Sequence, residues 1–312
     1  AKPFAGPGKW LSGFDVVNLM AGAHREFAHL TQATINKIAI EHGNKRQTAR
    51  RTRLSWRKSG GTRRSLGWVP FRDGQIRVKG GAVLFAGQRF RVFDSYGLGD
   101  HKVVAGSFSQ NALGEWFLNV AVKVAVVARE LPARAVGIDL GLKTIATTSD
   151  GDELPAGRWT RGAADRLAQA QRHAHKRQAK RIQKDVANRR KDALHKFSTA
   201  MVERYGAIYI GDVSSTRLAR TRMAKSVLDS GWGLFRTMLQ YKGEHAGSIV
   251  EVVGEKFTTQ ACADCGSLTG PKGRSGLVVR EWACVACGTT HRRDVNAARN
   301  ILARGLSGPF AG

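Results

Sequence analysis

Cysteine, acidic residues and long apolar runs are scarce in this sequence of 312 residues. Only four cysteines occur, all between positions 262 and 287, which suits a metal site in a reducing compartment better than a disulfide framework. No apolar run approaches the length that spans a bilayer, and no secretory signal is visible at the N-terminus. These absences argue against a disulfide-rich secreted domain, and we expect a soluble cytoplasmic protein.

The shortage of acidic residues leaves a large positive charge. Asp and Glu number 24 against 51 Lys and Arg, which gives a formal net charge of +27. A compact protein tolerates this excess mainly when a polyanion shares the charge, so nucleic acid is the leading partner and a membrane surface is the competing one. The length and a hydrophobic content of 42% are sufficient for about two domains with apolar cores.

The N-terminal part combines a helical pattern with a basic run that contains no acid. Apolar residues recur at helical spacing between residues 14 and 40, and Gly43 is a stop signal. The run 45–64 holds nine basic residues around Trp56. A solvated face is one explanation, but basic side chains beside an aromatic favour a groove that follows a nucleic-acid backbone. The candidate contact residues in this run are Arg50, Arg51, Arg53, Trp56, Arg57 and Lys58.

Over residues 65–132 the apolar period changes to two. Short alternating segments are separated by Asp-Gly, Gly-Gly and Ala-Gly turns, which predicts an antiparallel β-barrel or sandwich. Arg and Lys alternate with apolar residues along these segments, so one face can be basic while the other packs. We therefore expect a helical recognition region with a basic linker over 1–64 and a barrel over 65–132.

Strands and helices alternate from Ala135 onward, which predicts an α/β core over 133–256. Asp139 follows the strand residues Val136 and Ile138. A carboxylate on a buried strand is unfavourable unless a cation lies beside it, and on a chain this basic the simplest cation is a divalent metal that also holds a nucleic-acid phosphate. An ordinary aspartate at the start of a turn is the alternative.

A long basic helix, or a pair of helices, is expected over 160–197. Between positions 161 and 196 this stretch holds twelve basic residues and three acidic ones. A surface coiled coil explains its apolar stripe equally well, but charge of a single sign favours a nucleic-acid cover. The candidate contact residues are Lys176, Arg177, Lys180, Arg181 and Lys196.

Two Cys-x-x-Cys knuckles, separated by eighteen residues, form the strongest single motif. Four thiolates at this spacing, Cys262, Cys265, Cys284 and Cys287, predict one closed structural zinc site within a ribbon over 257–291. Iron in the same ligand set is the minor alternative. The ribbon leads into a helix whose first turn contains Asp294. One role that suits Asp294 is the N-cap of this helix. The other is a ligand whose carboxylate is directed at a metal held by Asp139.

In order and spacing, these motifs resemble the RuvC-like nuclease domain of transposon-encoded TnpB proteins, the family from which type V CRISPR effectors are thought to derive. Each short match is weak alone, whereas the ordered set is specific. The matching stretches are 137–143, 195–198, 208–213, 241–244, 257–260, both cysteine knuckles and 293–301, with 48–56 and 64–70 in the N-terminal half.

The resemblance implies an RNA-guided DNA endonuclease with an α+β multidomain fold. It implies a helical region and a wedge-like β-barrel that hold the guide RNA, then an RNase H-like (RuvC) domain with an inserted zinc ribbon, ending in the last RuvC motif and a helix over 292–312. Two Mg²⁺ ions would serve cleavage. The implied partners are a guide RNA from the transposon end and double-stranded target DNA with a short flanking motif, in a bacterial or archaeal nucleoid.

One position departs from the family pattern. The family usually carries its middle catalytic glutamate where this chain has Gly211. Asp212 is adjacent, but strand alternation directs it to the other face, so we favour Glu244 on the expected helix 232–246. The expected catalytic Mg²⁺ ligands are therefore Asp139, Glu244 and Asp294. An ordinary exposed role for Glu244 stays open, as do a nuclease-dead RNA-guided DNA-binding regulator and a guide-free nuclease or transposase accessory protein.

Overall fold

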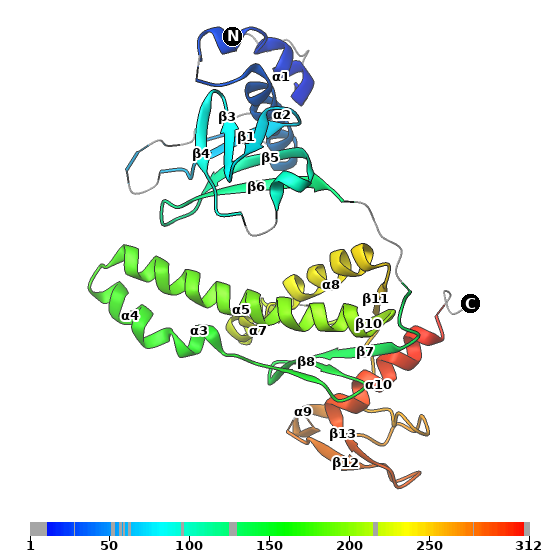
Figure 1. Ribbon diagram of the computed structural model, residues 1–312. Helices are drawn as coiled ribbons and strands as arrows, with labels where there is room; N and C mark the ends of the chain where they lie inside the picture. The colour runs from blue at the N-terminus through cyan, green and yellow to red at the C-terminus, as the bar shows by residue number, and fades with distance from the viewer. Residues whose placement is uncertain are drawn as a thin grey trace. The chain divides into compact units, whose positions relative to one another are not determined.

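The computed structural model describes residues 11–27, 29–50, 54–55, 58, 60–61, 64–94, 97–124, 130–214, 218–276 and 278–308. The chain divides into two compact units, residues 1–125 and 126–312, whose elements are labelled in Figure 1. We call them the N-terminal unit and the C-terminal unit and describe each by itself. The finer domain boundaries expected from the sequence stay predictions. Four of the expected nucleic-acid contacts, Arg51, Arg53, Trp56 and Arg57, lie outside the described residues.

The helical part of the N-terminal unit contains α1 (Gly13–Leu19), the short 3₁₀ helix η1 (Ala23–Arg25) and α2 (Gln32–Ala49). Ser12 and Asp15 form a capping box at the start of α1. The expected stop at Gly43 is wrong, because α2 continues for six residues beyond it. A Cβ at Gly43 would lie 2.7 Å from the Gly13 backbone, so this glycine permits the close crossing of α1 and α2.

Two three-stranded antiparallel sheets complete the N-terminal unit. One has the order β1 (Trp68–Arg72), β5 (Lys102–Gln110), β6 (Trp116–Lys123), and the other β2 (Ile76–Lys79), β3 (Ala82–Phe85), β4 (Gln88–Arg91). The 3₁₀ helix η2 (Leu98–Asp100) lies between β4 and β5. The sheets share a small core in which Phe71, Phe85 and Phe108 have ring centroids 5.3–6.0 Å apart. Neither sheet closes into a barrel among the described residues, so the expected β-barrel is not confirmed.

The C-terminal unit is built on one mixed sheet with the strand order β11-β10-β7-β8-β9. Strands β7 (Ala135–Leu140), β10 (Ala207–Gly211) and β11 (Ile249–Val253) are parallel, whereas β8 (Thr144–Thr148) and β9 (Glu153–Pro155) extend the sheet antiparallel. The alternation expected from the sequence is therefore present as a mixed α+β arrangement. Parallel β7, β10 and β11 bring their carboxyl ends to the same edge of the sheet.

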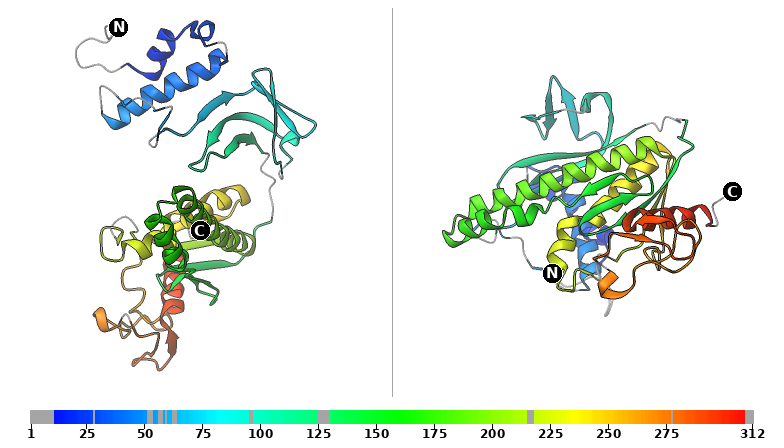
Figure 2. Two further views of the ribbon diagram at one scale, coloured as in Figure 1. Left: turned by 90° about the vertical axis from the view of Figure 1, so that its left-hand side faces the viewer. Right: turned by 90° about the horizontal axis from the view of Figure 1, so that it is seen from below.

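Helices cover both faces of this sheet (Figures 1 and 2). Val136, Ile138 and Leu140 of β7 share one buried core with α5 (Lys176–Arg204) and α8 (Trp232–Ala246). Gly137 faces the other way, toward α10 (Arg293–Leu306), where a Cβ would lie 2.0 Å from the Ala298 carbonyl oxygen. Strand alternation therefore places Asp139 on the α10 face of the sheet.

The remaining elements of the C-terminal unit are short. Helices α3 (Trp159–Gly162) and α4 (Ala164–Arg172) precede α5, and α7 (Ala224–Ser230) precedes α8. The cysteine-containing insertion, with α9 (Gly273–Gly276), β12 (Glu281–Ala283) and β13 (Thr290–Arg292), lies between β11 and α10. None of the described helices is long and apolar enough to cross a membrane.

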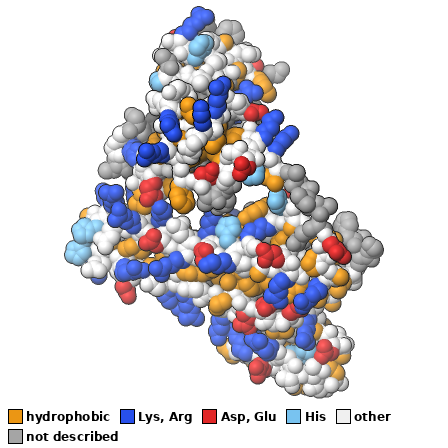
Figure 3. Space-filling view, in the orientation of Figure 1, with side chains coloured by type: hydrophobic (Ala, Val, Ile, Leu, Met, Phe, Trp, Pro, Cys, Tyr) orange, Lys and Arg blue, Asp and Glu red, His pale blue; other side chains and the backbone are white. Residues whose placement is uncertain are grey.

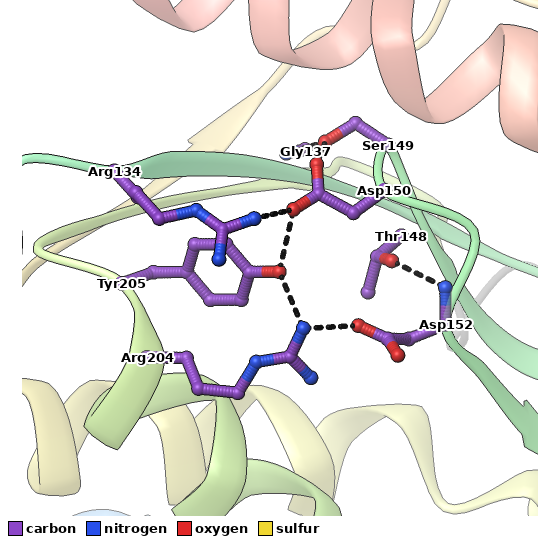
Figure 4. Close-up of polar contacts among 8 residues, drawn as sticks. All are labelled: Arg134, Gly137, Thr148, Ser149, Asp150, Asp152, Arg204 and Tyr205. Atoms are coloured by element: carbon purple, nitrogen blue, oxygen red, sulfur yellow. Dashed lines mark hydrogen bonds and ion pairs between the residues drawn. The ribbon is translucent and has the colours of Figure 1, made fainter.

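A polar network joins the C-terminal end of α5 to the start of β7 (Figure 4). Arg134 Nη2 lies 2.6 Å from Asp150 Oδ2, and the buried Tyr205 donates its hydroxyl proton to the same oxygen at 2.8 Å. Arg204 Nη2 pairs with Asp152 at 2.9 Å and also donates to the Tyr205 hydroxyl. Burial, followed by the hydrogen bond to Asp150, raises the pKa of Tyr205 to about 12. Both acids of this network are thus matched with arginine.

Candidate metal sites

A second carboxylate cluster surrounds Asp139 near the C-terminal end of β7. Burial, followed by the negative charges of Asp294 and Glu255, raises the pKa of Asp139 to about 7, whereas Arg293 acts in the opposite direction. Asp294 comes from the first turn of α10, and Glu255 follows β11 by two residues. The fold therefore brings together three acids from three separate segments. The two outer acids, Asp139 and Asp294, are those expected from the sequence.

Glu255 occupies the space that a side chain at position 211 would enter. A Cβ built on Gly211 would lie 2.9 Å from Glu255 Oε2 and 3.2 Å from Ile301 Cδ1. Gly211 is the last residue of β10 and pairs in register with Val253 of the parallel strand β11. The chain therefore supplies a carboxylate beside Gly211 from the neighbouring strand end.

The backbone around Glu255 is held by two charged side chains. Asp212 Oδ1 accepts a hydrogen bond from the Glu255 backbone N–H at 3.0 Å. Arg304 of α10 donates to the carbonyl oxygens of Gly254 and Lys256, each at 2.6 Å. Asp212, the second choice for the missing acid, thus binds the backbone of Glu255 and positions it.

The structure does not bring Glu244 to this cluster. Helix α8 buries Phe235, Met238 and Leu239 in the core on the sheet face opposite α10, and Glu244 is exposed on that helix. Asp139 lies on the α10 face, so α8 covers the wrong side of the sheet for the expected role. Sequence reasoning missed Glu255, although one signal was available: it lies just beyond the strand expected at 248–253, where parallel strand ends meet.

Asp294 is not the N-cap of α10. The N-cap position is Arg292, and its side chain makes no capping hydrogen bond. Asp294 Oδ2 instead lies 3.2 Å from Arg280 Nη1, in an ion pair whose side chains are 29% and 40% exposed, respectively. A pair this accessible to solvent contributes little stability, so Asp294 stays available to a stronger cation.

The donor set of Asp139, Glu255 and Asp294 fits magnesium. Carboxylate oxygens are the hard ligands that Mg²⁺ prefers, and a cation would offset the mutual repulsion that raises the pKa of Asp139. Among the described residues, the ligand atoms of these three acids do not all lie within 4.8 Å of one another. Two ions about 4 Å apart can be shared by carboxylates spread in this way.

The four cysteines form the second candidate metal site. Cys262 Sγ lies 3.6 Å from Cys287 Sγ, and Cys265 Sγ lies 3.7 Å from Cys284 Sγ. Tetrahedral zinc with Zn–S bonds of about 2.3 Å requires sulfur separations of roughly 3.8 Å, so this cluster can hold zinc. The glycine after each knuckle has φ +76° and donates its backbone N–H to the carbonyl of the first cysteine, so the two turns match.

Two of these thiols have pKa values shifted in opposite directions. Burial raises the pKa of Cys262 to about 12, and a hydrogen bond from Thr269 Oγ1 at 3.1 Å lowers the pKa of Cys284 to about 6. His291 Nε2 lies 3.0 Å from Cys262 Sγ, and its ring centroid is 4.8 Å from that of Trp282. His291 therefore packs behind one knuckle, and the four cysteines are sufficient for a zinc site without it.

The described basic residues expected to contact nucleic acid are accessible. Arg50, Lys58 and Lys196 are exposed, as are Lys176, Arg177, Lys180 and Arg181 on α5. Lys196 also pairs with Asp192 at 2.7 Å, one helical turn away. Figure 3 shows Lys and Arg side chains spread over the visible faces of the described parts. Their contact with nucleic acid stays a prediction.

Two protein families match the C-terminal part of the chain. The family described as "Cas12f1-like, TNB domain" matches residues 232–301, and the family described as "Probable transposase" matches residues 119–222. The first match includes the cysteine knuckles, Glu255 and Asp294, and the second includes Asp139. The matched segments therefore contain both candidate metal sites and define a transposon-associated class of proteins.

Curated relatives match this chain over about two thirds of its length. A Streptomyces pristinaespiralis protein named as a candidate RNA-guided DNA endonuclease is 33% identical over 65% of this chain and 53% of its own length, and an Escherichia coli K12 protein with a name of the same kind is 31% identical over 65% and 57%. The chain spans about half the length of these relatives. A solved Cas12f1–sgRNA–target DNA complex aligns over 95% of this chain and 86% of its own, with 15% identity and a TM-score of 0.43. These sequence matches show that the chain is similar to proteins of the TnpB type.

Proposed function

We propose that this protein is an RNA-guided DNA endonuclease whose C-terminal unit is an RNase H-like (RuvC) nuclease domain. The observation that carries the proposal is the Glu255 carboxylate beside Gly211, on the sheet face that bears Asp139. It supplies the third acid that the chain lacks at position 211. The names of the relatives support the same activity and its guide RNA.

Asp139, Glu255 and Asp294 would hold two Mg²⁺ ions. Bound there, the ions would activate a water molecule and stabilise the leaving oxygen in phosphodiester hydrolysis. The chain's own contribution is to hold the three carboxylates in place. Asp139 is held by sheet hydrogen bonds, Asp294 by the first turn of α10, and Glu255 by the backbone contacts of Asp212 and Arg304.

The remaining regions have supporting roles in this proposal. The N-terminal unit and the exposed basic face of α5 hold the backbones of a guide RNA from the transposon end and of double-stranded target DNA, and base pairing with the guide reads the sequence. The boundaries proposed for these parts are 1–64, 65–132, 133–256, 257–291 and 292–312. One zinc ion on the four cysteines stabilises the segment 257–291.

A nuclease-dead regulator is the alternative that Gly211 favours. The position of Glu255 argues against it, because a glycine at 211 removes one carboxylate while the neighbouring strand end supplies another at the same place. A guide-free nuclease would leave the large excess of basic side chains without a bound RNA to neutralise it.

The test begins with the protein purified together with its RNA. That RNA is sequenced, and DNA matching it is incubated with the complex and Mg²⁺. Cleavage by the wild type, lost in Glu255→Gln and kept in Glu244→Gln, is the expected result. A complex that binds the DNA and never cuts it would establish the regulator instead, and cleavage without RNA would establish the guide-free nuclease.

A further inference from the structure

The loop between β11 and the first cysteine knuckle, residues 254–261, presents an aromatic side chain on strained backbone. Phe257 has φ +65°, in the left-handed region that is unfavourable for a bulky residue and that is found preferentially at functional sites. Its side chain is 45% exposed. Burial of the ring within the protein therefore does not account for this conformation.

Helix α10 holds the loop on both sides of Phe257. Arg304 Nη1 and Nη2 each donate to a backbone carbonyl N-terminal to Phe257, at 2.6 Å. Asn300 Nδ2 donates to two carbonyls C-terminal to it, both at 2.8 Å. The next residue, Thr258, is buried. The backbone is thus held firmly while the ring faces outward.

The residues next to Phe257 indicate the kind of ligand that suits the ring. Phe257 follows Glu255 by two residues in the same loop. Lys256 Nζ lies over one face of the ring, 5.0 Å from its centroid, which leaves the opposite face for a ligand. An exposed ring stacks on a nucleobase whose face is open, and an ammonium group binds a phosphate. One unpaired nucleotide contains both groups, whereas the bases of a duplex are already stacked on each other.

We propose that Phe257 and Lys256 bind one unpaired nucleotide of the DNA strand entering the acid cluster, with its base on the Phe257 ring and its phosphate at Lys256. This inference rests on the proposed nuclease function and adds a residue contact that positions the strand at the site. Phe257 is a positioning residue: it orients the strand so that a phosphodiester reaches Glu255, without touching the reacting atoms itself.

Binding without catalysis gives the direct test. The protein–RNA complex in EDTA is titrated with single-stranded DNA oligonucleotides that carry 2-aminopurine at one position, whose fluorescence falls on stacking. We expect quenching by the wild type and by Phe257→Tyr. Phe257→Leu should abolish the quenching and weaken binding about tenfold. Tyr241→Leu, which removes a similarly exposed aromatic (46%) from α8, is the matched control and should behave like the wild type.

Thermal unfolding separates this role from a structural one. Glycine adopts positive φ without strain, so Phe257→Gly should have a melting temperature equal to or above that of the wild type while its quenching is lost. Wild-type quenching in both Phe257→Leu and Phe257→Gly would overturn the proposal. A large fall in melting temperature for Phe257→Gly would likewise overturn it, because the ring would then serve the fold.

The two proposals fail in different ways. If Glu255→Gln abolishes cleavage while Phe257→Leu keeps both quenching and cleavage, the nuclease assignment stands and the nucleotide contact is wrong. If the wild type shows Phe257-dependent quenching but never cuts DNA, the contact stands and the nuclease assignment is wrong. In Phe257→Leu, we expect the DNA concentration needed for the half-maximal cleavage rate to rise by a larger factor than the maximal rate falls.

Discussion

Two carboxylate clusters lie near opposite ends of strand β7, and they differ in whether their acids form ion pairs with arginine. At the N-terminal end, Asp150 and Asp152 each pair with an arginine around Tyr205 (Figure 4). At the C-terminal end, no described residue makes an ion pair with Asp139, and two further carboxylates raise its pKa. The acids of the first cluster are already neutralised by arginine. In the second cluster, a bound cation would reduce the repulsion between Asp139 and its neighbouring acids.

We expect this difference to separate groups that stabilise the fold from groups that serve the proposed reaction. Acids paired with arginine do not repel one another, although pairs whose acid side chains are 31% and 37% exposed add little stability of their own. Acids that repel one another reduce stability, and such arrangements occur preferentially at functional sites. The C-terminal unit contains both kinds on one sheet, so substitutions at the two ends of β7 should have opposite consequences.

The largest expected effect is on cleavage. Glu255→Gln keeps the shape of the side chain but removes a negative charge, so we expect the rate of DNA cleavage in Mg²⁺ to fall by at least about a hundredfold. Single-turnover cleavage by the protein–RNA complex is the measurement, with Glu244→Gln as the control of identical chemistry. An unchanged rate in Glu255→Gln would remove Glu255 from the site.

Moving the carboxylate from position 255 to position 211 tests the assignment of Glu255 more directly. Gly211→Glu combined with Glu255→Ala moves the carboxylate back to β10 and removes the atoms that a side chain at 211 would meet first. We expect this double variant to cleave faster than Glu255→Ala alone. Equal rates for the two variants would show that the positions are not equivalent.

Removal of zinc should unfold the ribbon and disturb the acid cluster beside it. Asn296 of α10 accepts a hydrogen bond from the Ala263 backbone N–H at 2.9 Å, which joins the ribbon to the helix that carries Asp294. After Cys262→Ser, limited proteolysis should cut within 257–291, because ribbons of this kind fold with their metal. Bound zinc is measured in parallel. A metal-free protein with an intact, protected ribbon would contradict the site.

Asp139→Asn should stabilise the metal-free protein. The folded pKa of about 7 lies above the ordinary value of 3.8, so protonated Asp139 is favoured on folding, and stability is lost as pH rises from about 4 through 7. In EDTA at pH 8 we expect the variant to gain on the order of 2 kcal/mol, seen as a melting temperature several degrees higher. At pH 4 the two proteins should melt together. A variant less stable at pH 8 would contradict the repulsion.

The smallest effect is expected at the arginine-matched end of β7. Tyr205→Phe removes the hydrogen bond to Asp150 and should lower the unfolding free energy by about 1 kcal/mol at neutral pH, with cleavage unchanged. The folded pKa of about 12 exceeds the ordinary 10, so the tyrosine's contribution is complete below pH 10 and disappears between pH 10 and 12. Chemical denaturation at pH 7 and pH 11 measures both. A large loss of cleavage would contradict the separation of the two clusters.

Much of the C-terminal unit follows from local patterns in the sequence. Ligands within one cysteine knuckle have only two residues between them, so spacing alone brings their sulfurs together. Alternation along β7 directs Val136 and Ile138 into the core and leaves Asp139 on the other face. The strands expected near 208–212 and 248–253 are present as β10 and β11.

The N-terminal unit was less predictable. Gly43 has the appearance of a helix stop, yet its lack of a side chain serves the crossing with α1, a contact between residues thirty positions apart. The alternating segments form two sheets without closure among the described residues, because period-two alternation specifies which side chains are buried but not which strands pair.

The sequence by itself predicts the thiolate ligand set and the two outer acids of the proposed sites, since each depends on spacing within a short segment. Only the tertiary structure indicates Glu255 as the candidate for the third acid. Glu244 and Glu255 are both far from Gly211 in the sequence. Which carboxylate lies beside Gly211 depends on which element packs next to β10 on the α10 face. The parallel register of Gly211 with Val253 brings Glu255 there, and α8 carries Glu244 to the opposite side of the sheet.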